Sequence, residues 1–243
     1  LAPCDYGRLD VAGNPVRIRL GSTAVRVRNA GDATEVGYVQ GGRLVRARAR
    51  HTILACYNSM IPYLLDDLPQ PQAEALAANV KAPLVYINVA LRNWRPWQQL
   101  GIYWARNPAG FLSTLTLDYP VSLGAYRFAR HPDEPIVAHL MHVPIVSGTG
   151  ADMRSQLRMA RQQLYERSFG DFEREIRDEM TRLLGPGGFD FDRDVAGITV
   201  NRWGHGYAYT ADALTDRPEV QRQRVALARQ PVGRVAIANS DAG

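Results

Sequence analysis

Apolar and polar side chains alternate along residues 16–56, and this period of two constrains the fold more than any other feature of the sequence. Successive side chains of a β-strand point to opposite faces, so this alternation indicates half-buried strands. Turn-forming residues interrupt it at Gly21, at Asn29-Ala30-Gly31-Asp32 and at Gln40-Gly41-Gly42. We therefore predict a β-meander from residue 16 onward that ends in a buried strand, 52–56.

The middle of the chain mixes strand and helix patterns. We predict a short helix from about Gln72 to Asn79 and a strand rich in β-branched and aromatic residues from Pro83 to Trp94. Further strands are expected between Tyr103 and Val143. Proline-containing breaks at 107–108 and 131–133 separate them.

A long amphipathic stretch begins after Asp152, a good helix N-cap, and ends at residues 185–187, Gly-Pro-Gly. Apolar residues return in it every three or four positions, and Gly170 is expected to divide it into two helices. A last strand pair, Ile198 to Tyr209 and Arg234 to Ala238, flanks an arginine- and glutamine-rich loop. The whole pattern predicts a mixed α/β (α+β) fold with mainly antiparallel strands.

The formal net charge is +5, with 28 arginines and one lysine. Arginines in the predicted strands alternate with apolar residues and so lie on the solvent side, and those at 154–182 are interleaved with acidic residues at helical spacing. This distribution argues against nucleic acid as a partner. The strand arginines are Arg17, Arg19, Arg26, Arg28, Arg46, Arg48 and Arg50.

Other classes are excluded by residue counts. The longest apolar runs, 84–91 and 136–146, are interrupted by polar residues and fall well short of the roughly 20 residues of a membrane span. Cys4 and Cys56 lack a C-x-x-C spacing, so neither a disulfide framework nor a metal site is indicated. The sequence starts at Leu1 without a methionine or a leader, and we expect both ends to lie inside a domain, with any targeting segment either removed or upstream.

Two features single out functional candidates. Lys81 is the only lysine, and its amine can lose a proton where a guanidinium cannot, although a leftover surface lysine is the alternative. The segment 201–209, Asn-Arg-Trp-Gly-His-Gly-Tyr-Ala-Tyr, packs three aromatic residues and a histidine around two glycines. Glycines let a backbone approach a flat ligand, and aromatic faces attract an amine cation. The alternative is an aromatic strand at a core edge, with His205 hydrogen-bonded to a neighbour.

Five segments, in order, resemble the flavin-containing amine oxidoreductases, and among them the bacterial proteins similar to spermidine dehydrogenase. They are VRIRLGSTAVRVRNAGD, HTILACYNSMIPYLLDDLP, VKAPLVYINVALRNW, ITVNRWGHGYAY and GRVAIANSDAG, and they run from residue 16 to 243. The resemblance implies the C-terminal part of a two-domain FAD-binding flavoprotein, with a mixed sheet, a helical substrate domain and no N-terminal Rossmann βαβ unit. Residues 1–57 and 206–243 would belong to the FAD-binding domain, and 58–205 to the substrate domain.

The resemblance also implies which residues would contact FAD. Ala24 and Val25 would back the adenosine end of FAD, and Ala55 and Cys56 would close on the same cofactor. Asn239-Ser240-Asp241 would form a turn whose carboxylate hydrogen-bonds the ribityl or phosphate portion.

The catalytic residues implied by the resemblance lie in and around the aromatic segment. Trp203 would lie near the flavin, Tyr207 would form part of an aromatic surface facing the substrate amine, and His205 lies between them. Lys81 resembles the lysine that many members hold near flavin N5 through a water.

Two departures from the family matter. Gly206 stands where the monoamine oxidase branch has a cysteine bonded to the flavin, so FAD should be bound non-covalently. The glycine-rich turn G-x-G-x-x-G, which in the family holds the FAD pyrophosphate at a helix N-terminus, is missing. This chain alone should therefore bind FAD poorly.

The implied reaction is oxidation of a polyamine or another amine by hydride transfer to flavin N5, with a small-molecule amine as the partner. The alternatives are an FAD oxidoreductase with a non-amine substrate, such as a desaturase-like enzyme, and a non-catalytic fragment or interaction module. Analogy places the protein in the periplasm, with the cytoplasm as the alternative, and the sequence does not fix the oligomeric state. Acidic candidates for the pocket are Asp118, Glu134, Asp190 and Asp212.

Overall fold

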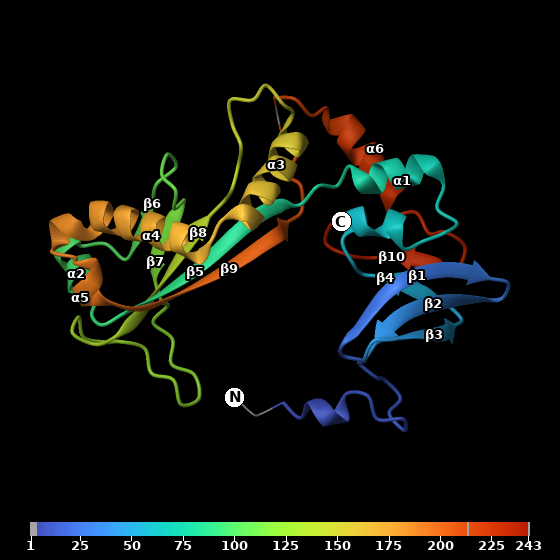
Figure 1. Cartoon of the computed structure of the whole chain (residues 1–243), viewed down its shortest axis with the longest axis horizontal. Helices are drawn as coiled ribbons and strands as arrows, with labels where there is room; N and C mark the ends of the chain where they lie inside the picture. The colour runs from blue at the N-terminus through green and yellow to red at the C-terminus, as the bar shows by residue number, and fades with distance from the viewer. Residues whose placement is uncertain (1–3, 213, 243) are drawn as a thin grey trace. The chain divides into compact units, whose positions relative to one another are not determined.

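The computed structural model describes residues 4–212 and 214–242 and divides into two compact units (Figure 1). Unit 1 contains the residues up to Val80 and those from Ala208 onward, and unit 2 runs from Lys81 to Tyr207. The first division lies later in the chain than the expected boundary at residue 57, and the second lies close to the expected residue 206. Unit 2 is thus a continuous insertion into unit 1.

The N-terminal strands of unit 1 form the predicted meander. Strands β1 (Ser22–Ala30), β2 (Ala33–Gln40) and β3 (Arg43–Ala49) pair antiparallel in the order β1-β2-β3. Gly31 and Gly41 have positive φ angles of 65° and 54° in the two hairpin turns, a backbone conformation that glycine adopts without steric cost. The turn residues in the sequence therefore predicted both hairpins correctly.

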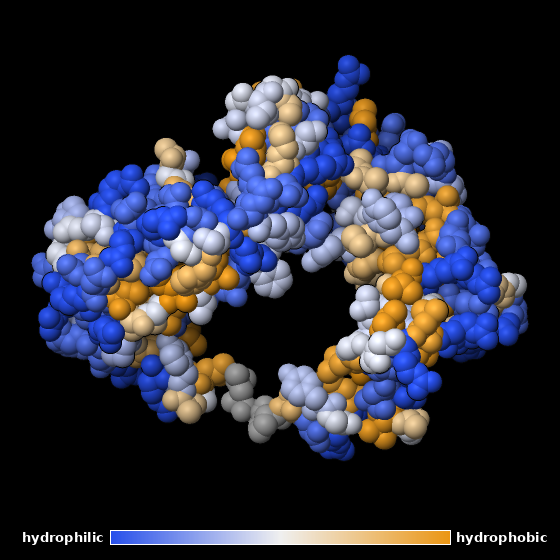
Figure 2. All heavy atoms as spheres, viewed as in Figure 1, coloured by the Kyte–Doolittle hydropathy of each residue, from blue (hydrophilic) through white to orange (hydrophobic). Residues whose placement is uncertain are grey.

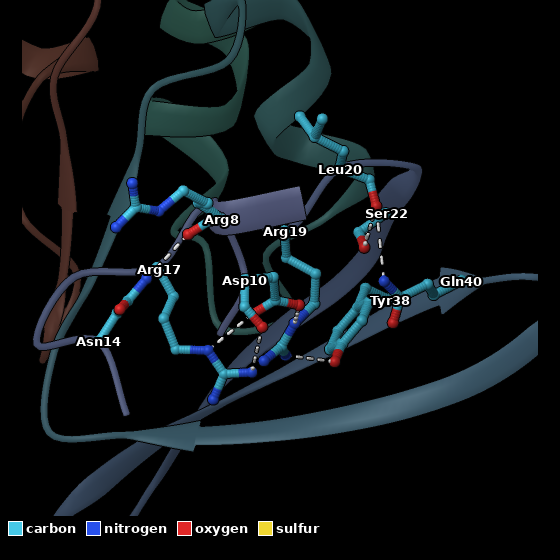
Figure 3. A network of polar contacts seen from close by, with 9 residues as sticks. All are labelled: Arg8, Asp10, Asn14, Arg17, Arg19, Leu20, Ser22, Tyr38 and Gln40. Carbon is cyan, nitrogen blue, oxygen red and sulfur yellow. Dashed lines mark hydrogen bonds and ion pairs between the residues drawn. The ribbon is translucent and has the colours of Figure 1, made fainter. Parts of the chain in front are cut away.

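The meander does not begin at Val16, as the alternation predicted. Residues 16–20 form no strand, and Arg17 and Arg19 instead bind the two carboxylate oxygens of Asp10, at 2.7 and 3.0 Å (Figure 3). The Arg19 guanidinium also donates to the Tyr38 hydroxyl at 2.6 Å. Polar partners, and not a neighbouring strand, thus hold this segment against the sheet.

A second, parallel sheet joins distant parts of the chain. Strand β4 (Thr52–Leu54) pairs with β10 (Val235–Ile237), with Thr52 opposite Val235 and Leu54 opposite Ile237. The predicted pairing of residues 198–209 with 234–238 is wrong, because residues 195–207 pair with residues 82–91 and β10 pairs with β4. The loop expected between them contains helix α6 (Pro218–Ala228).

Short helices cover the core of unit 1. Helix α1 (Gln70–Ala77) matches the predicted helix to within two residues, and it lies against α6, where Gln72 donates to the carbonyls of Ala228 and Gln230. A 3-10 helix, η2 (Asn58–Tyr63), follows β4, and another, η1 (Tyr6–Arg8), lies near the N-terminus. The buried apolar residues of this core are Val27, Leu54, Ile61, Leu65, Ala75, Leu76, Ala228, Val235 and Ile237.

Unit 2 is built on a five-stranded antiparallel sheet in the order β6-β7-β8-β5-β9. Strand β5 (Ala82–Leu91), between β8 and β9, stops three residues before the predicted end at Trp94, and the unpredicted helix α2 (Arg95–Leu100) follows. The other strands are β6 (Trp104–Arg106), β7 (Thr114–Leu117), β8 (Ile136–His142) and β9 (Val195–Tyr207).

Helices α3 (Met153–Glu166) and α4 (Phe169–Leu184) lie on one face of this sheet (Figure 1). Asp152 caps α3 as predicted, because its side chain accepts from the Ser155 amide at 3.1 Å. The break between the helices was predicted at Gly170 but lies at residues 167–168, because Ser168 and Asp171 form a reciprocal capping box that starts α4. The short elements η3 (Gly185–Gly187) and α5 (Phe191–Asp194) complete unit 2.

The two faces of the five-stranded sheet differ. One face packs against α3 and α4, with Val85, Ile87 and Leu140 buried against Phe172 and Ile176, and each large apolar side chain buried in this way contributes roughly 1.5–3 kcal/mol. Hydrophilic residues cover the outer side of α4 (Figure 2). No helix in the described part of the chain is long and apolar enough to cross a membrane. The second face, which we call the open face, carries Tyr86, Asn88, Thr116, His139, Met141, Thr199, Asn201 and Trp203.

Candidate functional site

The carboxyl ends of β4 and β10 bring five of the predicted residues together in unit 1. Ala55 and Cys56 follow β4, and Asn239, Ser240 and Asp241 follow β10. Because β4 and β10 are parallel, both segments leave the sheet at the same edge. Ligands of α/β proteins commonly bind outside this edge of parallel strands.

A compact hydrogen-bond network fixes the geometry of this edge. The Asn239 side-chain amide donates to the Cys56 carbonyl at 2.7 Å and to Asn58 Oδ1 at 2.8 Å. Asp241 Oδ2 accepts from the Asn58 backbone amide at 3.2 Å, and the Asp241 amide donates to Asn239 Oδ1 at 2.7 Å. The Asp241 residue is only 7% exposed and Asn58 is fully buried. These hydrogen bonds therefore hold the Asp241 carboxylate in a defined position in the turn after β10.

Asn58 belongs to this site but was missed by the sequence analysis. It lies at the start of η2, inside a stretch whose neighbours Leu54, Ile61 and Leu65 are buried and apolar. A buried amide in such a stretch requires hydrogen-bond partners, and that requirement was the available signal.

Cys56 is half-buried, and this burial raises the pKa of its thiol. A protonated thiol is a poor nucleophile, and the backbone carbonyl of Cys56 accepts a hydrogen bond from Asn239.

Ala24 and Val25 are not brought to this edge, since both lie in β1, in the other sheet of unit 1. Val25 is the extra residue of a β-bulge between Ala24 and Arg26 and is 44% exposed. Its side chain lines a surface depression of about 500 Å³ that also contains Arg28 and Glu35.

Trp203 and Tyr207 lie on β9 in unit 2, in register with Leu84 and Ala82 of β5. They are 54% and 63% exposed. Large aromatic side chains exposed to this degree contribute little to the core, and their ring faces are accessible to a ligand.

The two glycines of the aromatic segment serve packing within unit 2. A Cβ atom at Gly204 would overlap Tyr165 and approach Arg161, both on α3. At Gly206 a Cβ atom would approach Leu84. A side chain at either position would therefore meet neighbouring protein atoms of unit 2.

His205 contacts α3, as the alternative of a hydrogen bond to a neighbour describes, and its catalytic role stays a prediction. Its Nδ1 lies 3.1 Å from Nη1 of Arg161, and partial burial lowers the pKa of Arg161. Trp203 and Tyr207 therefore remain the exposed aromatic residues of the segment.

Lys81 directly precedes β5 and lies beside the Ala82–Tyr207 pair at the end of the β5–β9 ladder. It is 3% exposed. The alternative of a leftover surface lysine is therefore wrong. Ammonium groups are almost never so deeply buried without a specific partner.

A polar row across the open face was not predicted. Asp118 Oδ1 lies 3.1 Å from Nε2 of His139, and His139 Nδ1 lies 2.8 Å from Asn88 Oδ1. The Asn88 amide in turn donates to Thr199 Oγ1 at 3.1 Å. Asn88 interrupts the largely apolar strand β5, and this interruption was the sequence signal for a polar row.

On the open face, Tyr86 lies near Tyr207 of the aromatic segment. Burial raises the pKa of the Tyr86 hydroxyl, and the neighbouring Tyr119, Asp118 and Tyr207 raise it further. Asp118 and Tyr207 therefore both lie near the Tyr86 hydroxyl.

Three of the four acidic pocket candidates form local hydrogen bonds. Glu134 accepts from the backbone amides of Arg130 and His131, Asp190 caps α5, and Asp212 accepts from Leu214 and Thr215. Among the described residues, no three histidine, cysteine, aspartate or glutamate side chains are arranged to hold a metal ion.

No protein-family model matches the sequence, and no curated protein matches it significantly. Solved structures do match the fold. A putrescine oxidase bound to putrescine has a TM-score of 0.58 at 15% identity, over 91% of this chain and 43% of that chain. A triple mutant of putrescine oxidase from a redesign of cofactor binding gives 0.61 at 17%, over 91% and 43%. Cyclohexylamine oxidase from Brevibacterium oxydans gives 0.60 at 15%, over 90% and 42%.

This chain therefore spans less than half the length of these matched proteins. At such low identity the likeness concerns the backbone arrangement. The chain has the mixed α/β fold, with antiparallel sheets, of part of an amine oxidase.

Proposed function

We propose that this chain is part of an FAD-dependent amine oxidoreductase that oxidises a polyamine or another amine at the carbon next to nitrogen. The observation that carries the proposal is the amine oxidase fold, which extends over about nine tenths of the chain. One protein with this fold binds putrescine, a diamine, which supports an aliphatic amine as the substrate.

The donor and acceptor groups in unit 1 fit the hydroxyl-rich middle part of FAD. Asp241 and Asn58 combine a buried carboxylate with a buried amide at the carboxyl edge of β4 and β10, and a carboxylate is a strong acceptor for ribityl hydroxyls. Asp241 and the backbone at residues 55–56 would hold this part of the cofactor. The pyrophosphate would need a glycine-rich turn on a longer protein, because the sequence contains no G-x-G-x-x-G.

Bound FAD would supply acceptance of a hydride from the amine carbon. The faces of Trp203 and Tyr207 would bind and orient the amine, through attraction between an ammonium group and the ring electrons. Lys81 would hold a water molecule and exchange a proton with it, since a buried amine can act as a general acid or base.

The test compares the chain alone with the longer protein that this proposal requires. The longer protein should be yellow, release FAD on acid denaturation and lose its flavin absorbance when an amine is added without oxygen. The chain alone should be colourless. Reduction by a non-amine substrate and not by amines would favour a desaturase-like enzyme, and a longer protein without flavin would favour an interaction module.

A further inference from the structure

Unit 2 contains a cavity of about 550 Å³ at the edge of the open face. It lies between the β6–β7 side of the sheet and the loop that joins β7 to β8, which hangs on the side away from α3 and α4 (Figure 1). Binding sites for small molecules typically have volumes of about 300–1,000 Å³, a range that includes this one. Its apolar and aromatic lining includes Trp94, Tyr103, Leu117, Tyr119, Phe128 and Ile136.

Two charged side chains line this cavity, Asp118 and Arg130. The Arg130 guanidinium lies over the ring of Phe128, 5.5 Å from its centre. Asp118 can therefore attract one positive group, whereas Arg130 repels a second one. This combination favours a ligand with a single positive charge over a polycation.

Hydrogen bonds fix the Asp118 carboxylate in place. Its Oδ1 accepts from the Tyr119 amide at 2.9 Å and lies 3.1 Å from His139 Nε2, and its Oδ2 accepts from the Tyr126 hydroxyl at 2.6 Å. Burial alone would raise the pKa of Asp118, but these hydrogen bonds outweigh it and lower the pKa. The group is therefore an anion at neutral pH. A carboxylate accepts about four hydrogen bonds, so Oδ2 can accept another from a ligand.

A chain of hydrogen bonds connects the Asp118 carboxylate to the strands of the sheet. His139 is held by Asn88, and Asn88 is held by Thr199, so the row crosses from β8 through β5 to β9. The Asp118 carboxylate can bind the charged end of an organic ammonium ion, and the apolar cavity beside it can bind the rest of that ion.

We propose that this cavity binds a primary ammonium ion with one charged end and an apolar, aromatic body, with the ammonium group on Asp118 and the body between Tyr103 and Phe128. The proposal rests on unit 2 alone and does not require that FAD binds to unit 1.

Isothermal titration calorimetry on the full chain tests this site with three probes. We expect 2-phenylethylamine to bind at least about tenfold more tightly than 2-phenylethanol, its neutral counterpart, because a charge-assisted hydrogen bond is lost in the alcohol. Spermidine should also bind more weakly than 2-phenylethylamine. Equal affinity for amine and alcohol, or tighter binding of spermidine, would overturn the proposal.

Variants assign the binding to this cavity. Asp118→Asn should weaken 2-phenylethylamine binding about tenfold or more, to the level of the alcohol. The matched control is Asp178→Asn, an exposed carboxylate on α4 of the same unit, which should leave affinity unchanged. Unchanged binding in Asp118→Asn would place the ligand elsewhere.

Two further variants separate ligand binding from a structural role of Asp118 in its loop. Tyr126→Phe removes a competing donor, so the affinity for 2-phenylethylamine should stay the same or increase, whereas a purely structural loop contact predicts weaker binding. Ala129→Phe adds a large side chain to the cavity lining, leaves the Asp118 carboxylate in the sequence, and should abolish binding. Full binding in Ala129→Phe would overturn the proposal even if Asp118→Asn proved unstable.

Discussion

Gly206 on β9 lies so close to Leu84 on β5 that a Cβ atom at position 206 would stand 2.7 Å from the Leu84 Cβ. It would also stand 3.0 Å from the carbonyl oxygen of Ala82. Gly206→Ala should therefore lower the free energy of unfolding by about 1–3 kcal/mol, the usual cost of overpacking. Urea denaturation measures this change.

The matched control for this prediction is Gly197→Ala in the same strand, where a Cβ atom would meet nothing within 4 Å. This variant should be unchanged or more stable by up to about 1 kcal/mol, since alanine loses less backbone entropy than glycine on folding. Equal effects at both positions would mean that Gly206 is not confined by β5.

The second prediction concerns Asp241. Asp241→Ala should weaken FAD binding to the longer protein by roughly ten- to a hundredfold, because a hydrogen bond to a charged group contributes about 1.5–3 kcal/mol. Asp241→Asn keeps an acceptor for the Asn58 amide and should preserve the turn while still weakening FAD binding. Fluorescence titration with FAD measures both.

Asp32→Ala is the control for Asp241, since the Asp32 side chain is 86% exposed and pairs with Arg48 at 2.8 Å. FAD affinity should not change in this variant. If folded Asp241→Ala protein binds FAD as tightly as the unchanged protein, Asp241 does not contact the cofactor.

The third prediction concerns the exposed aromatic residues of β9. Trp203→Ala and Tyr207→Ala should each slow flavin reduction by amine about tenfold, because a cation–π contact to substrate is lost, while the unfolding temperature falls little. Trp104→Ala removes a half-exposed aromatic side chain from the opposite edge of the same sheet and serves as the control. A large loss of stability with a normal reduction rate would show these residues to be structural.

The fourth prediction concerns Lys81. Lys81→Met keeps the apolar stem of this buried side chain, so fold and FAD content should survive while flavin reduction or reoxidation slows by about ten- to a thousandfold. Lys81→Arg should restore little activity, since a guanidinium is larger and does not release its proton. Stopped-flow measurement of both half-reactions decides this, and unchanged rates in Lys81→Met would exclude a role in proton exchange.

The fifth prediction is a pH dependence that arises from His142. Burial lowers the pKa of His142 to about 4, although its contact with the Phe111 carbonyl works in the opposite direction. In the unfolded chain the pKa is about 6.5, so between these values the unfolded state binds a proton that the folded state does not. The contribution of His142 to the free energy of unfolding is therefore complete above about pH 6.5. As the pH falls toward 4, the free energy of unfolding decreases by at most about 3 kcal/mol.

Thermal unfolding between pH 7 and pH 4 measures this loss. His142→Asn retains a side-chain N–H for the Phe111 carbonyl and removes the titrating ring, so its stability should depend less on pH. His51→Asn alters an exposed histidine and should leave the pH dependence as it is. A pH profile that is identical in His142→Asn would contradict the assignment.

The sequence predicted local structure well where one local signal decides it. Asp152 and the helical period predicted α3 and α4, and Gly31 predicted a hairpin turn. The break at Gly170 was misplaced because the Ser168 capping box outweighs the low helix propensity of glycine. Strand alternation failed at residues 16–20, where ion pairs replace strand partners.

Long-range relationships could not be read from one sequence. Asn58 and Asp241 meet although 183 positions separate them, and no local pattern encodes that contact. The row from Asp118 to Thr199 likewise depends on the strand order of the sheet, which alternation does not determine. Predicted residues such as Trp203 and Lys81 came from unusual composition and from family resemblance, and their roles remain predictions.

The parallel pair of β4 and β10 has a consequence for the order of events during synthesis. A ribosome releases the residues of β4 early but those of β10 only after the whole of unit 2 has emerged. Unit 2 is continuous and can fold as soon as β9 is complete, whereas β4 must wait for its partner. A chain truncated before Val235 and released from the ribosome should therefore resist protease within residues 81–207 and be cut within the first eighty.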